Sequence, residues 1–538
     1  MRQTIGDIFG ETVDRLPDRI FLRSGERRIG FADAFASVET IGSALLGLGL
    51  ERGSRLALML PNSPEWVLIF LACARAGIMT ITINTRSKAD EIGYILAKSR
   101  ADALVMVDRF WDLDYRDLLG ELVPSVSIGA ASLLPSAGLP ALRHVVVLEG
   151  DKADLGLADW LAGQAQHGVA GAAPGDSQQD DAILTVFTSG TTGFPKGAMH
   201  SHVIMANVAN IARAMHIEEG DVILGHMPFY HVAGLCTALL PSILLGCTLV
   251  TMAHWQPRAA ARSIAANRVT IFGGIPTHFI DLVDVVEKDG IDTSCLKTAW
   301  IGGAAISPEI AGRARTVLGL TALQAAYGMT ETSACTTMSG FDDPVEMVGE
   351  GKGPPVGDFE VRVADPATGA ILAEGQNGEV LVRGHVVMLG YIEDDEETRK
   401  VLRPDGWFRT GDLGAFDAQG YLRITGRLKD MFIVGGSNVY PAEVERWIHR
   451  LPGVRLAAVV GIPDDRLGEV GFAFVERGDG PAMTREAILA YLKEQLADYK
   501  VPRHLAFVDR LPMTATRKIQ RHLLVALASD ILASPASS

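Results

Sequence analysis

Cysteine is scarce in this chain, with five residues among 538. None of the five falls in a CxxC pair or at a Cys/His spacing that ligates zinc, so neither a disulfide scaffold nor a structural zinc site is expected. The first nine residues include Arg2 and Asp7 where a secretory signal would be apolar. We therefore expect a reducing, cytoplasmic location. The cysteines are Cys73, Cys236, Cys247, Cys295 and Cys335.

Positively charged residues are also fewer than negatively charged ones. The chain has 49 Lys and Arg and 64 Asp and Glu, which gives a formal net charge of -15. Nucleic acid is disfavoured as the main partner, because binding its phosphates needs a net or local excess of Lys and Arg. An anionic small molecule would have to meet a site that gathers its positive groups locally.

Long hydrophobic runs are nearly absent. One uncharged stretch, Val232 to Met252, is long enough to span a bilayer. It is interrupted by Gly234, Pro241 and Gly246, and residues 247–252 have the pattern of a short strand. We expect a buried helix, a turn and a core strand here, and no integral membrane segment.

Apolar runs of strand length alternate with helical patterns through most of the chain. Residues 182–187 form one such run, and the following stripe has helical spacing at Val208, Ile211, Ala212 and Met215. This alternation predicts an α/β fold. A chain of 538 residues is too long for one ordinary core, so we expect several layers and more than one domain.

The predicted secondary-structure pattern of the sequence changes near Gly426 to Asp430. A strand-like run at 421–425 ends in GRLKD, and a new α+β pattern begins after it. We expect residues 1–426 to form a large N-terminal domain of sheets and helices, residues 427–430 the boundary, and residues 431–538 a small α+β domain.

The clearest motif, TSGTTGFPKGAMH, spans Thr188 to His200. Its glycines let the backbone approach a ligand, its amides and hydroxyl groups can surround a phosphate, and Lys196 adds a mobile cation. The motif differs from the P-loop of nucleoside triphosphatases, because Pro195 precedes Lys196 and Gly197 follows it. The candidate phosphate-binding residues are Thr188, Ser189, Gly190, Thr191, Thr192, Gly193 and Lys196.

Four further segments follow in order, namely GGAAIS at 302–307, YGMTET at 327–332, GWFRTGDLG at 406–414 and GRLKD at 426–430. Together the five motifs resemble those of the adenylate-forming superfamily of acyl-CoA synthetases, adenylation domains of peptide synthetases and beetle luciferases. The resemblance covers nearly the whole chain. It implies a large N-terminal domain of sheets and helices, and a small C-terminal domain that rotates over the active site.

The resemblance implies nucleotide-binding roles for residues in these motifs. Tyr327 would stack on adenine, Thr330 would contact the α-phosphate, and Glu331 would hold Mg²⁺ together with phosphate oxygens. Asp412 would accept hydrogen bonds from the ribose hydroxyls, and Arg427 would bind near the ribose. The ATP site would also include Gly303, Ala304 and Ile424.

The final motif, residues 497–524, resembles the segment whose lysine reaches into the active site of the family, and here that residue is Lys518. Its charge would stabilise the transition state as the carboxylate attacks the α-phosphorus. Arg517 departs from the family, in which glycine is usual, so the loop is expected to be stiffer and more cationic. Lys429 occupies the position that the family uses as the hinge between two domain arrangements.

The segment GGSNVYPAEVE resembles the version typical of acyl-CoA synthetases, in which Gly435 and Gly436 line the pantetheine tunnel, and this implies CoA as acceptor. In PFYHVAG, His231 is a candidate for orienting the substrate carboxylate. Small residues leave room along the expected acyl channel, and no fixed cation in these motifs could pair with a second carboxylate, which implies an apolar acid. The acyl-pocket residues are Ala305, Ala326, Gly328 and Ala334.

We therefore expect a free-standing enzyme that converts an acid and ATP to acyl-AMP and pyrophosphate, and then uses CoA to form acyl-CoA and AMP. Fatty acids rank first, while aryl, alicyclic and steroid-derived acids stay open, as does a homo-oligomer. The alternative reaction is the loading of a carrier protein. A non-catalytic nucleotide-binding scaffold is the alternative of another class, and it is disfavoured by the joint presence of Lys196, Glu331, Asp412, Arg427 and Lys518.

Overall fold

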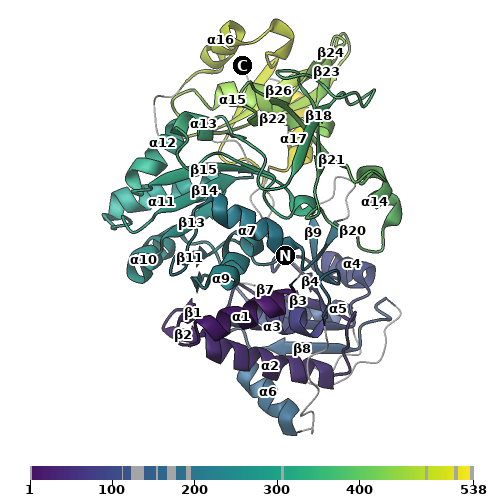
Figure 1. Ribbon diagram of the computed structural model, residues 1–538. Helices are drawn as coiled ribbons and strands as arrows, with labels where there is room; N and C mark the ends of the chain where they lie inside the picture. Colours follow the sequence, from purple (N-terminus) through teal and green to yellow (C-terminus); the bar gives the residue numbers. More distant parts are fainter. Residues whose placement is uncertain are drawn as a thin grey trace.

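The alternation of strands and helices expected from the sequence is present in the computed structural model of the chain (Figure 1). The structure describes residues 3–111, 113–122, 138–152, 155–166, 177–188, 195–303, 308–478, 481, 483–513 and 519–533. Among the described residues, a large N-terminal part holds three large sheets and a two-stranded ribbon, and a smaller C-terminal part holds one further sheet. The predicted α/β class, with a large and a small domain, is confirmed.

The first sheet has eight strands, of which the central ones are parallel. Its order is β16 (Thr337–Met338), β15 (Ala322–Tyr327), β14 (Thr298–Gly302), β13 (Ile271–Gly274), β11 (Val222–Gly225), β12 (Thr248–Thr251), β1 (Ile20–Ser24) and β2 (Arg27–Gly30). Strand β1, from the start of the chain, pairs in parallel with β12. Every residue of β12, β13 and β14 is buried, as parallel strands covered on both faces require.

The second sheet has seven strands. Its order is β20 (Gly390–Tyr391), β10 (Lys196–Ser201), β9 (Ala182–Thr188), β4 (Met79–Thr82), β3 (Arg55–Met59), β5 (Ala103–Val107) and β8 (His144–Leu148). From β9 to β8 the pairs are parallel, whereas β10 runs antiparallel to both β9 and β20. The predicted strand at 182–187 is therefore confirmed as β9. A separate ribbon joins β6 (Arg109–Phe110) to β7 (Leu113–Asp114).

Helix α3 (Pro64–Ala76) lies between these sheets and contacts β1 of the first and β4 of the second. All of its residues except Arg75 are buried. Its ends are set by the sequence: the Ser63 hydroxyl accepts a hydrogen bond from the amide of Trp66 at 3.2 Å, and Gly77 closes the helix at φ +70°. An apolar helix without a polar face thus supplies core to both sheets.

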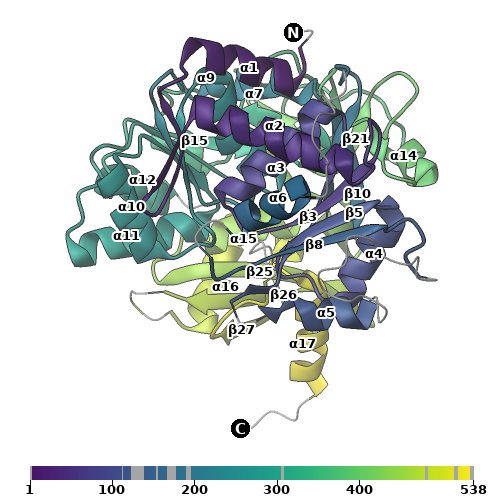
Figure 2. The same ribbon diagram turned by 90° about the horizontal axis from the view of Figure 1, so that it is seen from below.

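The other helices of the large part pack around the sheets (Figures 1 and 2). The predicted helical stripe is buried on α7, which confirms it. These helices are α1 (Ile5–Arg15), α2 (Phe31–Gly47), α4 (Ala89–Ser99), α5 (Tyr115–Leu122), α6 (Leu157–Gln166), α7 (Ile204–Ala214), α10 (Pro257–Asn267), α11 (Pro276–Asp289), α12 (Pro308–Val317), α13 (Val345–Gly349) and α14 (Asp395–Val401).

The uncharged stretch at 232–252 forms α8 (Val232–Gly234), a π-helical turn (Leu235–Leu239), α9 (Leu240–Leu245) and then β12. Gly246 ends α9 at φ +73°, so the predicted helix, turn and core strand are confirmed. Within the described ranges, no helix has the length and apolar character needed to cross a membrane.

The third sheet is antiparallel and contains five strands. Its order is β17 (Lys352–Gly353), β22 (Leu422–Arg427), β21 (Phe408–Phe416), β19 (Gly378–Arg383) and β18 (Glu360–Ala364). The register of β21 and β22 sets Asp412 directly opposite Arg427.

The C-terminal part follows the 3-10 turn η3 (Leu428–Asp430). Its sheet contains β24 (Ser437–Val439), β23 (Phe432–Val434), β26 (Gly468–Arg477), β25 (Val454–Asp464) and β27 (His504–Val508). The helices are α15 (Pro441–Ile448), α16 (Arg485–Gln495) and α17 (Arg521–Ala533), with a 3-10 turn at Asp498–Lys500. Helix α15 packs on β22, and Arg455 lies 3.8 Å from the carboxylate of Asp281 on α11. These contacts join the two parts.

Candidate active site

The predicted phosphate loop joins β9 to β10. Strand β9 ends at Thr188 and β10 begins at Lys196, and the two residues pair across the antiparallel ladder. The Thr188 hydroxyl donates to the carbonyl oxygen of Lys196 at 3.3 Å, which closes the base of the loop. A Cβ on Gly197 would lie 2.7 Å from methyl carbons of Ile392 and Thr185, so glycine is required there. Ser189, Gly190, Thr191, Thr192 and Gly193 lie outside the described residues.

Lys196 contacts two groups that the sequence analysis did not single out. Its ammonium forms an ion pair with Glu397 on α14, and it lies 5.3 Å from the centroid of the Tyr391 ring on β20. Hydrogen bonding to Lys196 and to Lys400 lowers the pKa of the Glu397 carboxyl to about 2. The acidic run around α14 looks like a solvated surface in the sequence, so no local signal identified Glu397.

Tyr327, Asp412 and Arg427 meet at one point, although they come from three strands. The Tyr327 hydroxyl donates to Asp412 Oδ2 at 2.9 Å, and Arg427 Nε lies 3.1 Å from Asp412 Oδ1. Asp412 is 4 % exposed. Burial, reinforced by the charge of Asp412, raises the pKa of Tyr327 well above its ordinary value, so the phenol stays a neutral donor. Ile424, on β22, packs against the same apolar cluster as the Tyr327 ring.

Thr330 and Glu331 lie in the 3-10 turn η2 (Thr330–Thr332), directly after β15. Thr330 is buried, and Glu331 Oε1 accepts a hydrogen bond from the Tyr391 hydroxyl at 2.7 Å. Burial and the Glu331 carboxylate raise the pKa of Tyr391 above its ordinary value. Tyr391 therefore contacts both the predicted metal ligand and the predicted phosphate-binding lysine.

The described residues hold no cluster of three or more His, Cys, Asp or Glu side chains that could bind a metal ion by themselves. A Mg²⁺ ion near Glu331 would therefore take its remaining ligands from phosphate oxygens and water. That donor set, with one carboxylate and the substrate phosphates, fits Mg²⁺.

Two of the predicted acyl-pocket residues have a backbone role. A Cβ on Gly328 would lie 2.0 Å from the carbonyl oxygen of Ala334, so the chain on either side of η2 leaves no room for a side chain. Ala334 itself has φ +80°. Ala326 lies on β15, paired with Gly302 and Met338. The remaining acyl-pocket residue, Ala305, lies outside the described residues, as does Ala304 of the ATP site.

His231 is the N-cap of α8, where its Nδ1 accepts a hydrogen bond from the amide of Ala233 at 3.2 Å. This contact gives the imidazole a fixed orientation at the end of a short helix. Gly303 follows β14 with φ +79°, and a Cβ there would lie 3.2 Å from the side chain of Ile275.

Lys429 lies in η3, between β22 and β23, and its side chain is exposed. The surrounding protein and the nearby Arg427 guanidinium lower the pKa of its ammonium group. Gly435 and Gly436 form the exposed turn between β23 and β24, at φ +56° and +84°. In the described part of the chain, Leu467 alone approaches within 4 Å of a Cβ built on either glycine. Lys518 lies outside the described residues.

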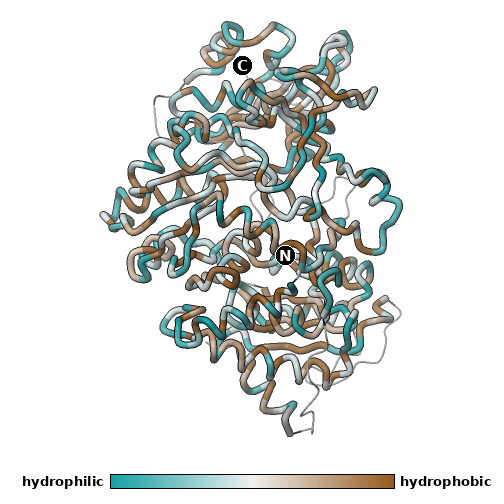
Figure 3. The backbone as a smooth tube through the Cα atoms, viewed as in Figure 1, coloured by the Kyte–Doolittle hydropathy of each residue, from teal (hydrophilic) through white to brown (hydrophobic). Residues whose placement is uncertain are grey.

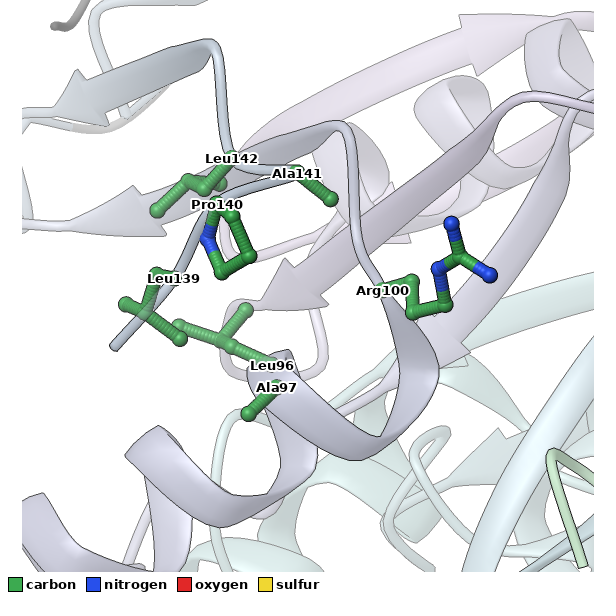
Figure 4. Close-up of a pocket in the computed structure, with 7 residues that line it drawn as sticks. All are labelled: Leu96, Ala97, Arg100, Leu139, Pro140, Ala141 and Leu142. Atoms are coloured by element: carbon green, nitrogen blue, oxygen red, sulfur yellow. The ribbon is translucent and has the colours of Figure 1, made fainter. Parts of the chain in front are cut away.

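A pocket of about 170 Å³ lies elsewhere, between the end of α4 and the segment before β8 (Figure 4). Apolar side chains and Arg100 line it, and none of them belongs to the predicted site.

Comparison with known proteins gives a match to the family described as AMP-binding enzyme at residues 9–392, and to the AMP-binding enzyme C-terminal domain at residues 443–518. The chain is 36% identical to the mitochondrial medium-chain acyl-CoA ligase of Danio rerio, over 97% of this chain and 88% of that protein. It is also 36% identical to a methyl-dioxo-octahydroindenyl-propanoyl:CoA ligase of Mycobacterium tuberculosis, over 96% and 98% of the two chains.

Among solved structures, the anthranilate CoA ligase AuaEII in complex with anthranoyl-AMP is similar, with a TM-score of 0.86 and 26% sequence identity. The similarity covers 99% of this chain and 98% of that one, so it includes both parts of the fold. The five motifs, the architecture and these matches agree: the chain belongs to the family of AMP-binding enzymes, among its acyl-CoA synthetases.

Proposed function

We propose that this enzyme uses ATP and Mg²⁺ to activate an apolar carboxylic acid as acyl-AMP and then transfers the acyl group to CoA. The meeting of Tyr327, Asp412 and Arg427 supports this most strongly, because a phenol, a buried carboxylate and a guanidinium converge from three strands. Such a group of oriented donors and acceptors suits a ribose and adenine. The two relatives named above are acid:CoA ligases by name, which supports a thiol acceptor.

In the first half-reaction, a carboxylate oxygen of the acid attacks the α-phosphorus of ATP, and the bond from that phosphorus to the bridging oxygen breaks. Pyrophosphate leaves. Thr188 and Lys196 bind the phosphates, Tyr327 stacks on adenine, and Asp412 and Arg427 hold the ribose. Glu331 would hold Mg²⁺ together with phosphate oxygens, and the ion would supply positive charge against the negative charge that develops on them.

In the second half-reaction, the CoA sulfur attacks the carbonyl carbon of acyl-AMP, the thiol proton passes to solvent, and AMP leaves. Lys518 serves the first half alone, because its charge is needed where phosphate charge develops. Rotation about Lys429 then brings Gly435 and Gly436 towards the pantetheine chain. The exposed hairpin turn with two positive φ angles suits that contact, because it lets backbone approach the ligand closely.

The proposed acid is apolar, with medium-chain fatty acids first and alicyclic propanoic acids second. One relative is named for medium-chain acyl groups and the other for an octahydroindenyl-propanoyl group, so both chemistries occur in similar proteins. His231, fixed by its own backbone contact, would orient the carboxylate.

We also place the enzyme in a reducing cytoplasm. Cys73, Cys236, Cys247 and Cys335 are free and buried. Burial raises the pKa of the Cys73 and Cys335 thiols to about 12, which keeps them protonated and unreactive.

The deciding experiment measures pyrophosphate release with MgATP over fatty, aryl and alicyclic acids, each with and without CoA, together with the thioester formed. Acid-dependent pyrophosphate release and a CoA thioester are expected. Acyl-AMP that accumulates despite CoA would indicate a carrier protein as acceptor instead. An absence of pyrophosphate release with every acid would indicate a non-catalytic scaffold.

A further inference from the structure

The phosphate-loop lysine has an anionic partner on another element of the structure. Lys196 pairs with Glu397, and its ammonium lies over the ring of Tyr391, whose hydroxyl donates to Glu331. Both side chains of the ion pair are mostly buried, at 20% and 26% exposure. A bound nucleotide would offer Lys196 a second anion, its phosphates, at the site next to Glu331.

The backbone at Glu397 is held in place at the start of α14. Its amide donates to Asp394 Oδ1 at 3.2 Å, which caps α14. Asp394 is bound by Lys98 at 3.0 Å, and the neighbouring Glu393 by Arg55 at 2.8 Å, which ties the helix start to the second sheet and α4. Both ribbon views place this helix at the edge of the molecule (Figures 1 and 2), and Figure 1 shows it beyond β20.

Glu397 also has a second cation on its own helix. Lys400 donates to Glu397 Oε1 at 2.6 Å, while Lys196 contacts Oε2. Lys400 bonds Glu396 as well, at 2.8 Å, and is more than half exposed. The chain around α14 is strongly hydrophilic (Figure 3). If Lys196 moved to a phosphate, the carboxylate of Glu397 would therefore keep one counter-ion.

We infer that Glu397 is a positioning residue that holds Lys196 in the nucleotide-free enzyme and gives it up to the phosphates of ATP, with Lys400 neutralising Glu397 after the exchange. This inference rests on the proposed function, because it needs Lys196 to bind phosphate. The ion pair with Glu397 and the contact with the Tyr391 ring order the Lys196 side chain, so the conformational entropy of ordering it is lost before ATP binds. Breaking the ion pair has an opposing cost, which weakens nucleotide binding.

Two substitutions with opposite expected effects on MgATP binding test the exchange. Glu397→Gln removes the competing charge and should tighten MgATP binding about two- to fivefold, the range of a partly exposed ion pair. Lys400→Gln leaves Glu397 with Lys196 as its main counter-ion and should weaken MgATP binding by a similar factor. The matched control is Asp395→Asn, which removes the same charge from the same helix at an exposed position that forms no ion pair with Lys196 or Lys400 among the described residues.

The measurement is the Kd of MgATP by calorimetry on the full chain without acid or CoA, followed by KM and kcat for MgATP in acid-dependent pyrophosphate release. Opposite shifts in Kd and KM, with kcat changed less than about twofold and the control unmoved, support the exchange. Unchanged Kd in both variants, or weaker binding with a lower kcat in Glu397→Gln, overturns it. If the Kd values shift as expected but no acid gives product, the proposed function fails while the exchange stands.

Discussion

At the scale of single residues, Asp412 shows how the nucleotide end of the site is prepared. A carboxylate that is 4 % exposed would be costly to bury alone, but the Tyr327 hydroxyl and the Arg427 guanidinium bind its two oxygens. If Asp412 is the acceptor for the ribose, as proposed, it is oriented before the ligand binds. Preorganisation of this kind reduces the ordering cost of association.

Glu331 should be required for chemistry but not for folding. In Glu331→Gln the amide oxygen can still accept the hydrogen bond of Tyr391, while the negative charge that would bind Mg²⁺ is lost. We expect pyrophosphate release to fall roughly 100-fold, and the unfolding midpoint to stay close to that of the wild type. Normal turnover with an unchanged Mg²⁺ dependence would remove Glu331 from the metal site.

Whether the sequence could reveal a feature of the site depends on whether a local motif carries it or whether it joins residues far apart in the chain. The motifs assign proposed roles to Thr188, Tyr327 and Asp412, because the resemblance carries those roles position by position. They could not reveal that Lys196 pairs with Glu397, 201 residues later, because that contact depends on how β20 and α14 dock beside β10. An acidic helix start looks the same in the sequence whether it faces solvent or a lysine.

At the scale of elements, the turn after β15 depends on close packing of backbone. The small size of Gly328 could serve an acyl chain, but the structure offers a nearer reason in the carbonyl of Ala334. We expect Gly328→Ala to lower the free energy of unfolding by about 2 kcal/mol or more and to reduce turnover with every acid alike.

The matched control for this substitution is Gly312→Ala on α12, where no atom lies within 4 Å of the new Cβ among the described residues. That variant should be unchanged or more stable by about 0.5 kcal/mol. Urea unfolding and an acyl-chain-length series are measured on both variants. If Gly328→Ala is stable and only its chain-length preference changes, the glycine serves the acyl pocket instead.

The docking of helix α1 against the rest of the protein should weaken as the pH falls. His202 Nδ1 accepts a hydrogen bond from the Ile5 amide at 2.9 Å, and burial lowers the His202 pKa to about 4 from 6.5. Below pH 6.5 His202 is protonated in the unfolded chain, whereas in the folded chain it stays neutral down to about pH 4. The free energy of unfolding therefore falls as the pH is lowered through this window. The slope from one such proton is at most about 1.4 kcal/mol per pH unit.

The test compares urea unfolding of the wild type and His202→Asn at pH 7, 5.5 and 4.5. Asparagine keeps an acceptor near the position of Nδ1 but does not titrate in this range. The variant should lose less stability between pH 7 and 4.5, although the buried His200, with a pKa of about 4, keeps some pH dependence. Parallel curves would show that the folded protein protonates His202 near its ordinary pKa, so that this histidine adds no pH dependence to stability.

At the scale of the whole molecule, the two parts meet through η3, the contact of α15 with β22 and the pair between Arg455 and Asp281. If Lys429 is the hinge, two half-reactions need two sets of backbone torsions at one residue. Proline fixes φ near -65° and restricts the preceding residue, so Lys429→Pro should trap one arrangement. It should keep single-turnover pyrophosphate release but lose most thioester formation.

Lys429→Ala is the control, because it removes the charge without constraining the backbone, and it should retain both half-reactions. The two halves are assayed separately on folded protein, the second with supplied acyl-AMP and CoA. Equal loss of both halves in the proline variant, or no loss, would move the pivot away from Lys429.

The pairing of β1 with β12 has a consequence for how the chain is made. The hydroxyl of Thr248 donates to the carbonyl oxygen of Ile20, a contact that spans 228 residues. At ordinary rates of protein synthesis, the ribosome needs roughly 10 to 50 seconds to produce the intervening chain. During that time β1 can pair only with β2 and lacks β12, its other neighbour in the first sheet, and the apolar α3 has only part of its surroundings. The nascent chain must therefore pass through a period in which hydrophobic segments are exposed, and it is then that a chaperone would bind it most readily.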